Sequence, residues 1–256
     1  MSVLLSEMRG SVLWLTLNRP ETINAFNGEL LTGLKAAFDT AATDEAVRAI
    51  VVRGADRGFT SGQDLKAFGS LGLSVREGLG YYTRLVQSMT ACEKPILASI
   101  HGAAAGAGMS FALACDYRIA AENAVLTTGF SRIGLIPDCA MPYTLPRIVG
   151  YAKAFELATL SPRMSAQECL ALGLVNKVVP LEQLESETAA IAEQFASGPT
   201  RTYGLIKRAL RLSSQSSLEE MLELEAEIQD LASQTTDHQE GVRAFFEKRL
   251  PEYKGK

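Results

Sequence analysis

Residues 94–116 read KPILASIHGAAAGAGMSFALACD, and this stretch predicts a strand, a turn of small residues and the start of a helix. The apolar run Pro95–Ile100 is typical of a buried strand, and Met109–Ala114 of an apolar helix. Gly and Ala fill most of the sequence between them, so a ligand can approach the backbone N–H groups closely. The helix N-terminus adds about half a positive charge. The stretch therefore predicts a binding site for an oxygen that carries negative charge.

The overall composition is that of an ordinary globular domain and argues against several classes of partner. The chain has 256 residues, of which 47% are hydrophobic and 21% charged, with a net charge of −4. Nothing in this balance indicates nucleic acid or an anionic membrane surface as a partner. No apolar stretch reaches the roughly 18–20 residues that a membrane span needs, and the N-terminal MSVLLSEMRG lacks the features of a secretory signal.

The cysteines and histidines argue against disulfide and metal chemistry. The four cysteines, at positions 92, 115, 139 and 169, form no CxxC pair, which is typical of reduced thiols in a cytoplasmic protein. His101 and His238 are the only histidines, so we expect no metal site and no serine–histidine hydrolase. We expect His101, at a strand end, to have a structural hydrogen-bonding role.

A second junction of small residues precedes the first. The strand VRAIVVRG at 47–54 leads into ADRGFTSGQDLKAF at 55–68, where Gly62 is followed by a helix starting near Asp64. Residues 69–80 are glycine-rich and weakly periodic, which predicts a mobile surface loop before a helix at 81–91. We expect the segment 68–82 to set the shape of the pocket.

The remaining patterns predict strands and helices in a repeating order. A hairpin is expected at 3–18, a helix at 28–40 and two short strands at 117–130. The three prolines in 131–150 predict short helical turns rather than one long helix, and 151–198 predicts helix, helix, strand, helix. The repeat of strand, strand and helix predicts a spiral α/β core over residues 1–196. Residues 197–256 read as helices that pack either on the core of the same chain or on a neighbouring subunit, and we favour the neighbouring subunit.

Blocks spread over nearly the whole chain resemble the crotonase (enoyl-CoA hydratase/isomerase) superfamily, in the order of that family. They are NRPETINAF at 18–26, FTSGQDLKAF at 59–68, KPILASIHGAAAGAG at 94–108, LACDYRIA at 113–120, IGLIPD at 133–138, ALGLVNKVV at 171–179 and DHQEGVRAFFEKRLPEYKG at 237–255. The resemblance implies a spiral of ββα turns with a C-terminal α-helical trimerisation region, assembled as a homotrimer or a dimer of trimers. It also implies an acyl-CoA thioester substrate and no cofactor beyond the coenzyme A of that substrate.

The resemblance also assigns an oxyanion hole. Its two donors would be the backbone N–H groups of Gln63 and Ala107, which would hold the thioester oxygen as it gains negative charge, at about 3 kcal/mol each. Ala107 departs from the usual glycine of the family, but a methyl side chain leaves the N–H free. Relatives contact the coenzyme A at positions that correspond to Asn24, Ala25, Asp64 and Leu65. Phe245 and Lys248 match tail positions that touch the nucleotide end, often in a neighbouring subunit; alternatively they are an apolar anchor and a solvated charge.

Three positions bear on which reaction the superfamily member performs. Ser110 and Phe130 occupy the two places where the namesake hydratase carries glutamates, and hydration needs groups that activate water and supply a proton. Asp138 remains, at the position of the single acid/base in related isomerases. We expect burial beside Phe130, Ile133 and Ile136 to raise its pKa. Alternatively, Asp138 caps a helix that begins after Pro137, and the adjacent Cys139 lines the pocket.

These features favour an acyl-CoA isomerase. The strings FSRIGLIPD and YTLPRIVG resemble the epoxyphenylacetyl-CoA isomerases of bacterial phenylacetate catabolism. An enoyl-CoA hydratase and a non-catalytic acyl-CoA-binding protein remain as alternatives. A dehalogenase-like member would need a histidine on the preceding helix, where YYTRLVQSM has none.

Overall fold

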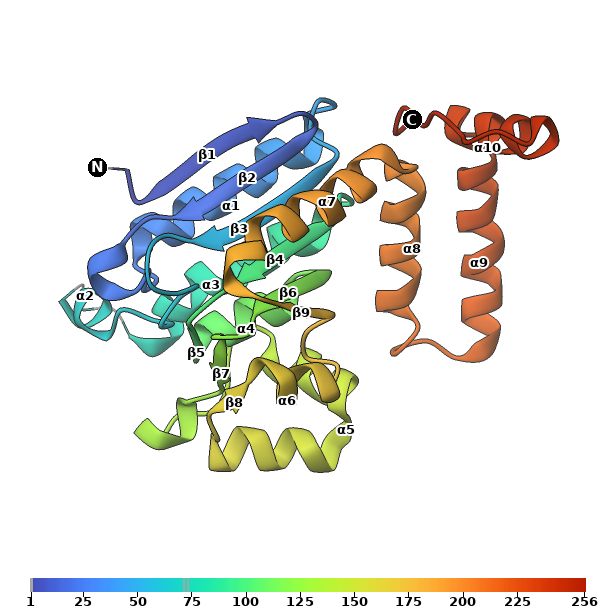
Figure 1. Cartoon of the computed structure of the whole chain (residues 1–256). Coiled ribbons are helices and arrows are strands. Elements are labelled where there is room, and N and C mark those ends of the chain that lie inside the picture. The colour runs from blue at the N-terminus through green and yellow to red at the C-terminus, as the bar shows by residue number, and fades with distance from the viewer. Residues whose placement is uncertain (1, 71, 73) are drawn as a thin grey trace.

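The computed structural model describes residues 2–70, 72 and 74–256, and its centre is a six-stranded sheet (Figure 1). The strand order is β1-β2-β3-β4-β6-β9. The hairpin of β1 and β2 is antiparallel, as predicted, and the remaining neighbours are parallel. The strands are β1 Leu4–Arg9, β2 Val12–Leu17, β3 Ala49–Gly54, β4 Ile96–Ile100, β6 Tyr117–Ala121 and β9 Lys177–Val179.

Helices cover both faces of this sheet, which explains why its inner strands are apolar without alternation. In β3, Ile50 and Val52 face the core that includes helices α1, α3 and α4, whereas Ala49 and Val51 face α7. The hydrophobic stripe predicted for 28–40 is the buried side of α1. The four helices are α1 Gly28–Thr43, α3 Val75–Ala91, α4 Ala107–Ala114 and α7 Leu184–Ser197.

A small second sheet shows that the chain climbs as a spiral. It has the order β5-β7-β8, with β5 at Ala103–Ala105, β7 at Val125–Thr127 and β8 at Met164–Ser165. One turn runs through β4, β5 and α4, and the next through β6, β7 and α5 (Met141–Leu160), so each turn gives a strand to each sheet before its helix. This confirms the mixed α/β spiral. The short elements η1 Pro20–Thr22, η2 Phe130–Ile133, α6 Ala166–Ala171 and η3 Leu181–Gln183 link the turns.

Two predicted segments differ from the structure. Much of the loop expected at 69–80 is helical, because α2 spans Leu65–Ser70 and α3 begins at Val75; residues 71 and 73 of that prediction lie outside the described part. A capping box of Ser74 and Glu77 starts α3, so its glycines are tolerated. Of the short turns expected at 131–150, η2 and the loop after it are present, but residues 141–149 form a continuous helix, the first part of α5, which breaks at Gly150, where φ is 76°.

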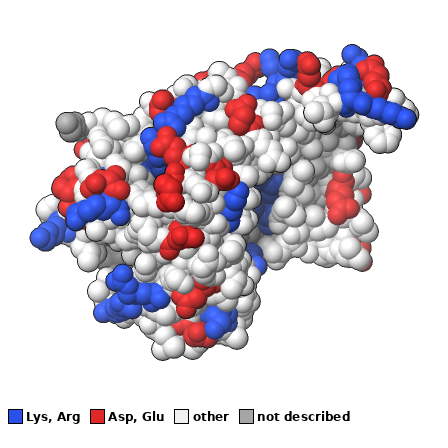
Figure 2. Space-filling view, in the orientation of Figure 1, with Lys and Arg blue, Asp and Glu red and all other residues white. Residues whose placement is uncertain are grey.

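The C-terminal helices stand apart from the sheets, with α8 at Thr200–Leu212, α9 at Leu218–Ser233 and α10 at Thr236–Glu247 (Figure 1). They expose apolar side chains, among them Ile206, Leu210, Leu218, Leu222 and Phe246. Trimerisation through this region stays a prediction. Acidic and basic side chains are mixed over the face drawn in Figure 2. Among the described residues, no helix is both long and apolar enough to cross a bilayer.

Candidate active site

The two small-residue junctions of the sequence meet at one place in the fold. A methyl carbon built on Gly62 would lie 2.5 Å from the Ala105 carbonyl oxygen and 3.3 Å from the Ala107 nitrogen. One built on Gly108 would lie 2.6 Å from Cγ2 of Thr60. Only glycine allows this approach, and the φ of +95° at Gly62 also requires it. The junction at 60–64 therefore lies directly against the start of α4.

Hydrogen bonds on either side of Gln63 direct its N–H group away from the neighbouring segment around Phe26. The Phe26 N–H donates to the Gly62 carbonyl at 2.7 Å, and the Asp64 N–H donates to the Phe26 carbonyl at 2.9 Å. These two bonds form a parallel bridge in which Gln63 is paired with Phe26. In such a bridge the N–H of the residue between the two bonds points to the opposite side. Within the part of the chain that the structure describes, the Gln63 N–H therefore has no acceptor on the Phe26 segment and points to the side where a ligand could meet it.

Ala107 is the first residue of α4, two residues earlier than the predicted helix start. Gly106 precedes it with φ of 54°, and the first bond of the helix runs from the Ser110 N–H to the Gly106 carbonyl at 3.1 Å. The N–H of Ala107 lies ahead of that bond, in the turn that has no acceptor within the helix. Two backbone donors thus lie on adjoining segments at a helix N-terminus. This arrangement can stabilise negative charge on one oxygen.

Asp138 lies just before α5, on a backbone that turns sharply. Cys139 and Ala140 both have left-handed φ angles, 51° and 65°, and the Cys139 thiol donates to Oδ1 of Asp138 at 2.9 Å. Burial raises the pKa of the Asp138 carboxyl, and the bond from Cys139 partly opposes that rise. Burial and the neighbouring carboxylate also raise the pKa of the Cys139 thiol, which keeps it protonated as a donor. The expected rise in the Asp138 pKa is confirmed.

Two details of the prediction for Asp138 are wrong. Ile133 and Ile136 are 57% and 81% exposed, because the end of η2 and the segment after it run over the surface. Phe130 and Cys139 are the buried residues near Asp138 in the sequence. The alternative role of Asp138 as a helix cap also fails. The capping residue of α5 is Ala140, and no side chain caps this end of the helix.

Ser110 has no base beside it within the described residues. It is fully buried on α4, and its hydroxyl donates back to the Gly106 carbonyl at 3.3 Å. Phe130 is 7% exposed and belongs to the main hydrophobic core. Among the described residues, no group of three His, Cys, Asp or Glu side chains could hold a metal ion.

The residues predicted to contact coenzyme A gather around one arginine that sequence reasoning missed. Arg19 donates to the Ala25 carbonyl at 2.5 Å and to the Asp64 carboxylate at 2.9 Å. Asp64 also caps α2 through the Ala67 N–H, and these bonds lower the pKa of its carboxyl. The side chain of Asn24 is buried and used within the fold, since it binds the Arg19 N–H and the carbonyls of Ala55 and Gly58. Leu65 is 58% exposed at the start of α2.

Comparison with known proteins identifies the family of this chain. The sequence profile of the enoyl-CoA hydratase/isomerase family matches residues 7–256. The chain is 38% identical to the 1,2-epoxyphenylacetyl-CoA isomerase of Escherichia coli, over 100% of both chains. It is 40% identical to a probable enoyl-CoA hydratase of Rhodobacter capsulatus, over 94% of both.

The chain belongs to the enoyl-CoA hydratase/isomerase family. A crystal structure of an enoyl-CoA hydratase from Bacillus anthracis has the same fold, with a TM-score of 0.91 and 32% identity over 99% of this chain and 100% of that one. Membership confirms the resemblance drawn from the sequence blocks, and it makes the chain an enzyme that acts as an acyl-CoA hydratase or isomerase.

Phe245 and Lys248, the predicted nucleotide contacts of this family member, lie far from the junction within one chain. Both are on or just after α10, beyond α8 and α9 (Figure 1). Phe245 is 78% exposed and borders a cavity of about 520 Å³ between α8, α9 and α10. Their contact with substrate stays a prediction, and it requires a second copy of the chain.

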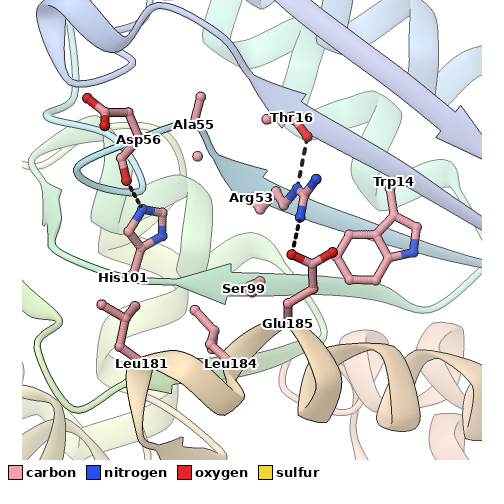
Figure 3. Close-up of a pocket in the computed structure, with 11 residues that line it drawn as sticks. Trp14, Thr16, Arg53, Ala55, Asp56, Ser99, His101, Leu181, Leu184 and Glu185 are labelled. Carbon is pink, nitrogen blue, oxygen red and sulfur yellow. Dashed lines mark hydrogen bonds and ion pairs between the residues drawn. The ribbon is translucent and has the colours of Figure 1, made fainter.

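A separate cavity of about 420 Å³ contains none of the predicted site residues (Figure 3). It lies on the α7 side of the sheet, between Trp14, Arg53 and Glu185. His101 borders it and bonds to the Asp56 carbonyl at 2.8 Å through Nε2. This bond gives His101 the structural role expected from its position at a strand end.

Tyr82, on α3, packs beside the segment that carries the junction and lies near Asp138. Its ring packs edge-on against Phe26 at 6.0 Å, and Phe26 is bonded to the Gly62–Asp64 segment. Burial, together with the nearby acidic groups of Cys139, Asp138 and Asp64, raises the pKa of the Tyr82 hydroxyl. The Tyr82 hydroxyl therefore lies near Asp138 and Cys139, while its ring lies against the segment that carries the junction. Sequence reasoning placed it only at the edge of the pocket segment.

Proposed function

We propose that this enzyme is an acyl-CoA isomerase that moves a double bond from the β,γ to the α,β position of an acyl-CoA, or opens a ring epoxide. In this proposal the N–H groups of Gln63 and Ala107 hold the thioester oxygen, and Asp138 is the acid/base. Asn24, Ala25, Asp64 and Leu65 border the coenzyme A of the substrate, and Ser110, Phe130 and Cys139 line the pocket.

The double-bond shift needs one base and one anion site. The Asp138 carboxylate removes a proton from the α-carbon, and the electron pair of that C–H bond moves through the chain to leave a dienolate. The two amides stabilise its oxygen, with an expected contribution of about 3 kcal/mol each. The same carboxyl then returns the proton to the γ-carbon. No atom is gained or lost, and no cofactor beyond the coenzyme A of the substrate is required.

The observation that carries the proposal is a half-buried Asp138 carboxyl close to Tyr82, whose ring packs on Phe26 and so on the segment that carries the Gln63 N–H; burial raises the pKa of this carboxyl. A carboxyl whose pKa lies above the ordinary value of an aspartate is a stronger base once ionised and a usable acid once protonated. Ser110 and Phe130 stand where hydration would need carboxylates, and the Ser110 hydroxyl bonds to the backbone of its own helix.

An activity panel tests the proposal. The substrates are 3-hexenoyl-CoA, 1,2-epoxyphenylacetyl-CoA and crotonyl-CoA, assayed separately for isomerisation and for addition of water. We expect kcat/KM for isomerisation of at least one of the first two to exceed that for hydration of crotonyl-CoA by at least about 100-fold, since a missing acid/base costs about 10²–10⁴. Hydration of crotonyl-CoA at a comparable rate would overturn the proposal.

Hydration remains the second candidate, because the Rhodobacter relative at 40% identity is named a probable enoyl-CoA hydratase. In that case Asp138 alone would activate water and manage the α-proton. The panel separates the two reactions directly. A homotrimer or dimer of trimers in the cytoplasm is part of the proposal, supported by the exposed apolar side chains of α8–α10.

Replacing Cys139 tests how Asp138 is tuned. The thiol lowers the pKa of Asp138, so Cys139→Ala is expected to raise that pKa further. Since the free enzyme needs the carboxylate as base, the acidic limb of kcat/KM against pH should move to higher pH, and the activity loss should be largest at low pH. Cys139→Ser keeps a donor and should move the limb back toward wild type. If the acidic limbs of the kcat/KM profiles against pH coincide for Cys139→Ala and wild type, Cys139 does not lower the pKa of Asp138.

A further inference from the structure

One buried polar group in the candidate site has no use in the mechanism above. Tyr82 is 3% exposed, and its hydroxyl has no hydrogen-bond partner among the described residues. An unpaired buried hydroxyl costs about 1–3 kcal/mol of stability. Its high pKa keeps it protonated, so it is present as a donor at any working pH.

Aromatic side chains fix the position of this hydroxyl. The Tyr82 ring stacks on Phe68 at 6.1 Å and meets Phe26 edge-on at 6.0 Å. Phe68 belongs to α2, directly after the junction that carries Gln63, and Phe26 is hydrogen-bonded to that junction. With both neighbours packed, the tyrosine cannot turn its hydroxyl to solvent without breaking the aromatic cluster.

The surroundings indicate what this hydroxyl would bind. A simple fatty acyl chain offers no hydrogen-bond acceptor, so the Tyr82 hydroxyl would stay unpaired, at the same free-energy cost as in the protein without substrate. An acyl group with an acceptor oxygen would satisfy it, in a site where water cannot compete. Phe26 and Phe68 belong to the hydrophobic core, so the hydroxyl has apolar neighbours and the acceptor oxygen would have to come from the substrate.

We propose that the Tyr82 hydroxyl is a specificity-determining donor, which hydrogen-bonds to an oxygen carried by the acyl group of the substrate. This inference rests on the proposed acyl-CoA site at Gln63, Ala107 and Asp138, and it deepens the proposed function by naming what selects the substrate: an acceptor oxygen on the acyl group, such as that of a ring epoxide. A site built around a polar contact rejects the analogue that lacks it, because its own polar group is left unpaired.

The test uses a matched pair of unreactive ligands, 2-hydroxyphenylacetyl-CoA and 2-methylphenylacetyl-CoA, with dissociation constants measured by calorimetry. The two differ only in an oxygen that replaces a methyl carbon. Wild-type protein should bind the hydroxyl compound about tenfold more tightly than the methyl compound, and Tyr82→Phe should reduce this ratio to near one. Tyr81→Phe is the matched control, since it removes the hydroxyl of the adjacent tyrosine and should keep the wild-type ratio.

Three results would overturn the inference. The first is that the wild type binds both ligands with equal affinity, and the second is that the ratio of the two dissociation constants is the same in Tyr82→Phe as in the wild type. The third is that Tyr82→Phe loses affinity equally for both ligands and shows a shifted pH profile of kcat/KM. The last result would mean that Tyr82 acts on Asp138 instead. Phenylalanine keeps the aromatic packing and removes an unpaired hydroxyl, so Tyr82→Phe should melt at or above the wild-type temperature. Because the measurement is of binding, it remains informative if the wild type fails the activity panel, and the two failures stay distinguishable.

Discussion

Replacing Asp138 with asparagine is expected to lower kcat for β,γ-enoyl-CoA isomerisation by about 10³-fold, because a carboxamide can neither take up nor return the migrating proton. The substitution is nearly isosteric, and the carboxamide oxygen that it introduces can still accept from the Cys139 thiol. Substrate affinity should therefore change little compared with kcat. Initial rates and calorimetric binding of a saturated acyl-CoA measure the two effects.

The same variant should unfold no more easily than wild type at neutral pH. The pKa of Asp138 is raised in the folded protein above its usual 3.8, so its favourable contribution is present at low pH and is lost as pH rises through the raised value. The stability of Asp138→Asn relative to wild type should accordingly grow with pH across that window, as measured by denaturant unfolding. Asp56→Asn is the control: it changes an exposed aspartate in a left-handed conformation that asparagine tolerates. If Asp138→Asn keeps more than a tenth of wild-type activity, Asp138 is not the acid/base.

Replacing Gly62 with alanine should lower kcat/KM by about 10²-fold or more, since loss of one oxyanion donor costs about 10²–10³ in rate. The new methyl carbon would lie 2.5 Å from the Ala105 carbonyl oxygen, in a backbone with φ of +95°. The junction must move, and the movement carries the Gln63 N–H away from Ala107. We expect the free energy of unfolding to fall by about 1–3 kcal/mol. Rates on a β,γ-enoyl-CoA and denaturant unfolding measure both effects.

Gly69→Ala is the matched control for this variant. Gly69 lies in α2, and a methyl group built on it meets no atom of the described residues within 4 Å. Gly108→Ala approaches the same junction from the helix side, 2.6 Å from Thr60 Cγ2, and should share the loss. Wild-type kcat/KM in a folded Gly62→Ala protein would exclude the junction as an oxyanion site.

The predictable parts of the fold were those fixed by local pattern. Continuous apolar runs identified β3 and β4, and the small residues around Gly62 and Gly106 marked the two junctions from sequence alone. The start of α3 was missed because its glycines suggested a loop, while the capping interaction of Ser74 and Glu77 is a local signal that could have revealed it. The first part of α5, residues 141–149, was missed because its prolines suggested short turns, although Pro142 lies at the start of this helix and Pro146 inside it.

The candidate site was predictable where backbone groups carry it and unpredictable where side chains meet across the fold. Arg19 reaches Asp64 over 45 positions of sequence, and no spacing rule indicates that contact. The unpaired hydroxyl of Tyr82 depends on the packing of Phe26 and Phe68 from other elements. The exposure of Ile136 likewise depends on the path of a surface segment rather than on its hydrophobic composition.

The ββα spiral distributes the site over successive turns of the chain. In the proposed site, the two anion donors are main-chain groups around β5, whereas the acid/base carboxyl is a side chain on the segment between β7 and α5. If these roles hold, a change in the segment 128–140 would alter the acid/base, and with it the bond that is made or broken, without altering the two donors for the thioester oxygen. Recognition of the thioester and choice of reaction would then depend on different segments of the chain, so a single scaffold could change its chemistry one peptide segment at a time.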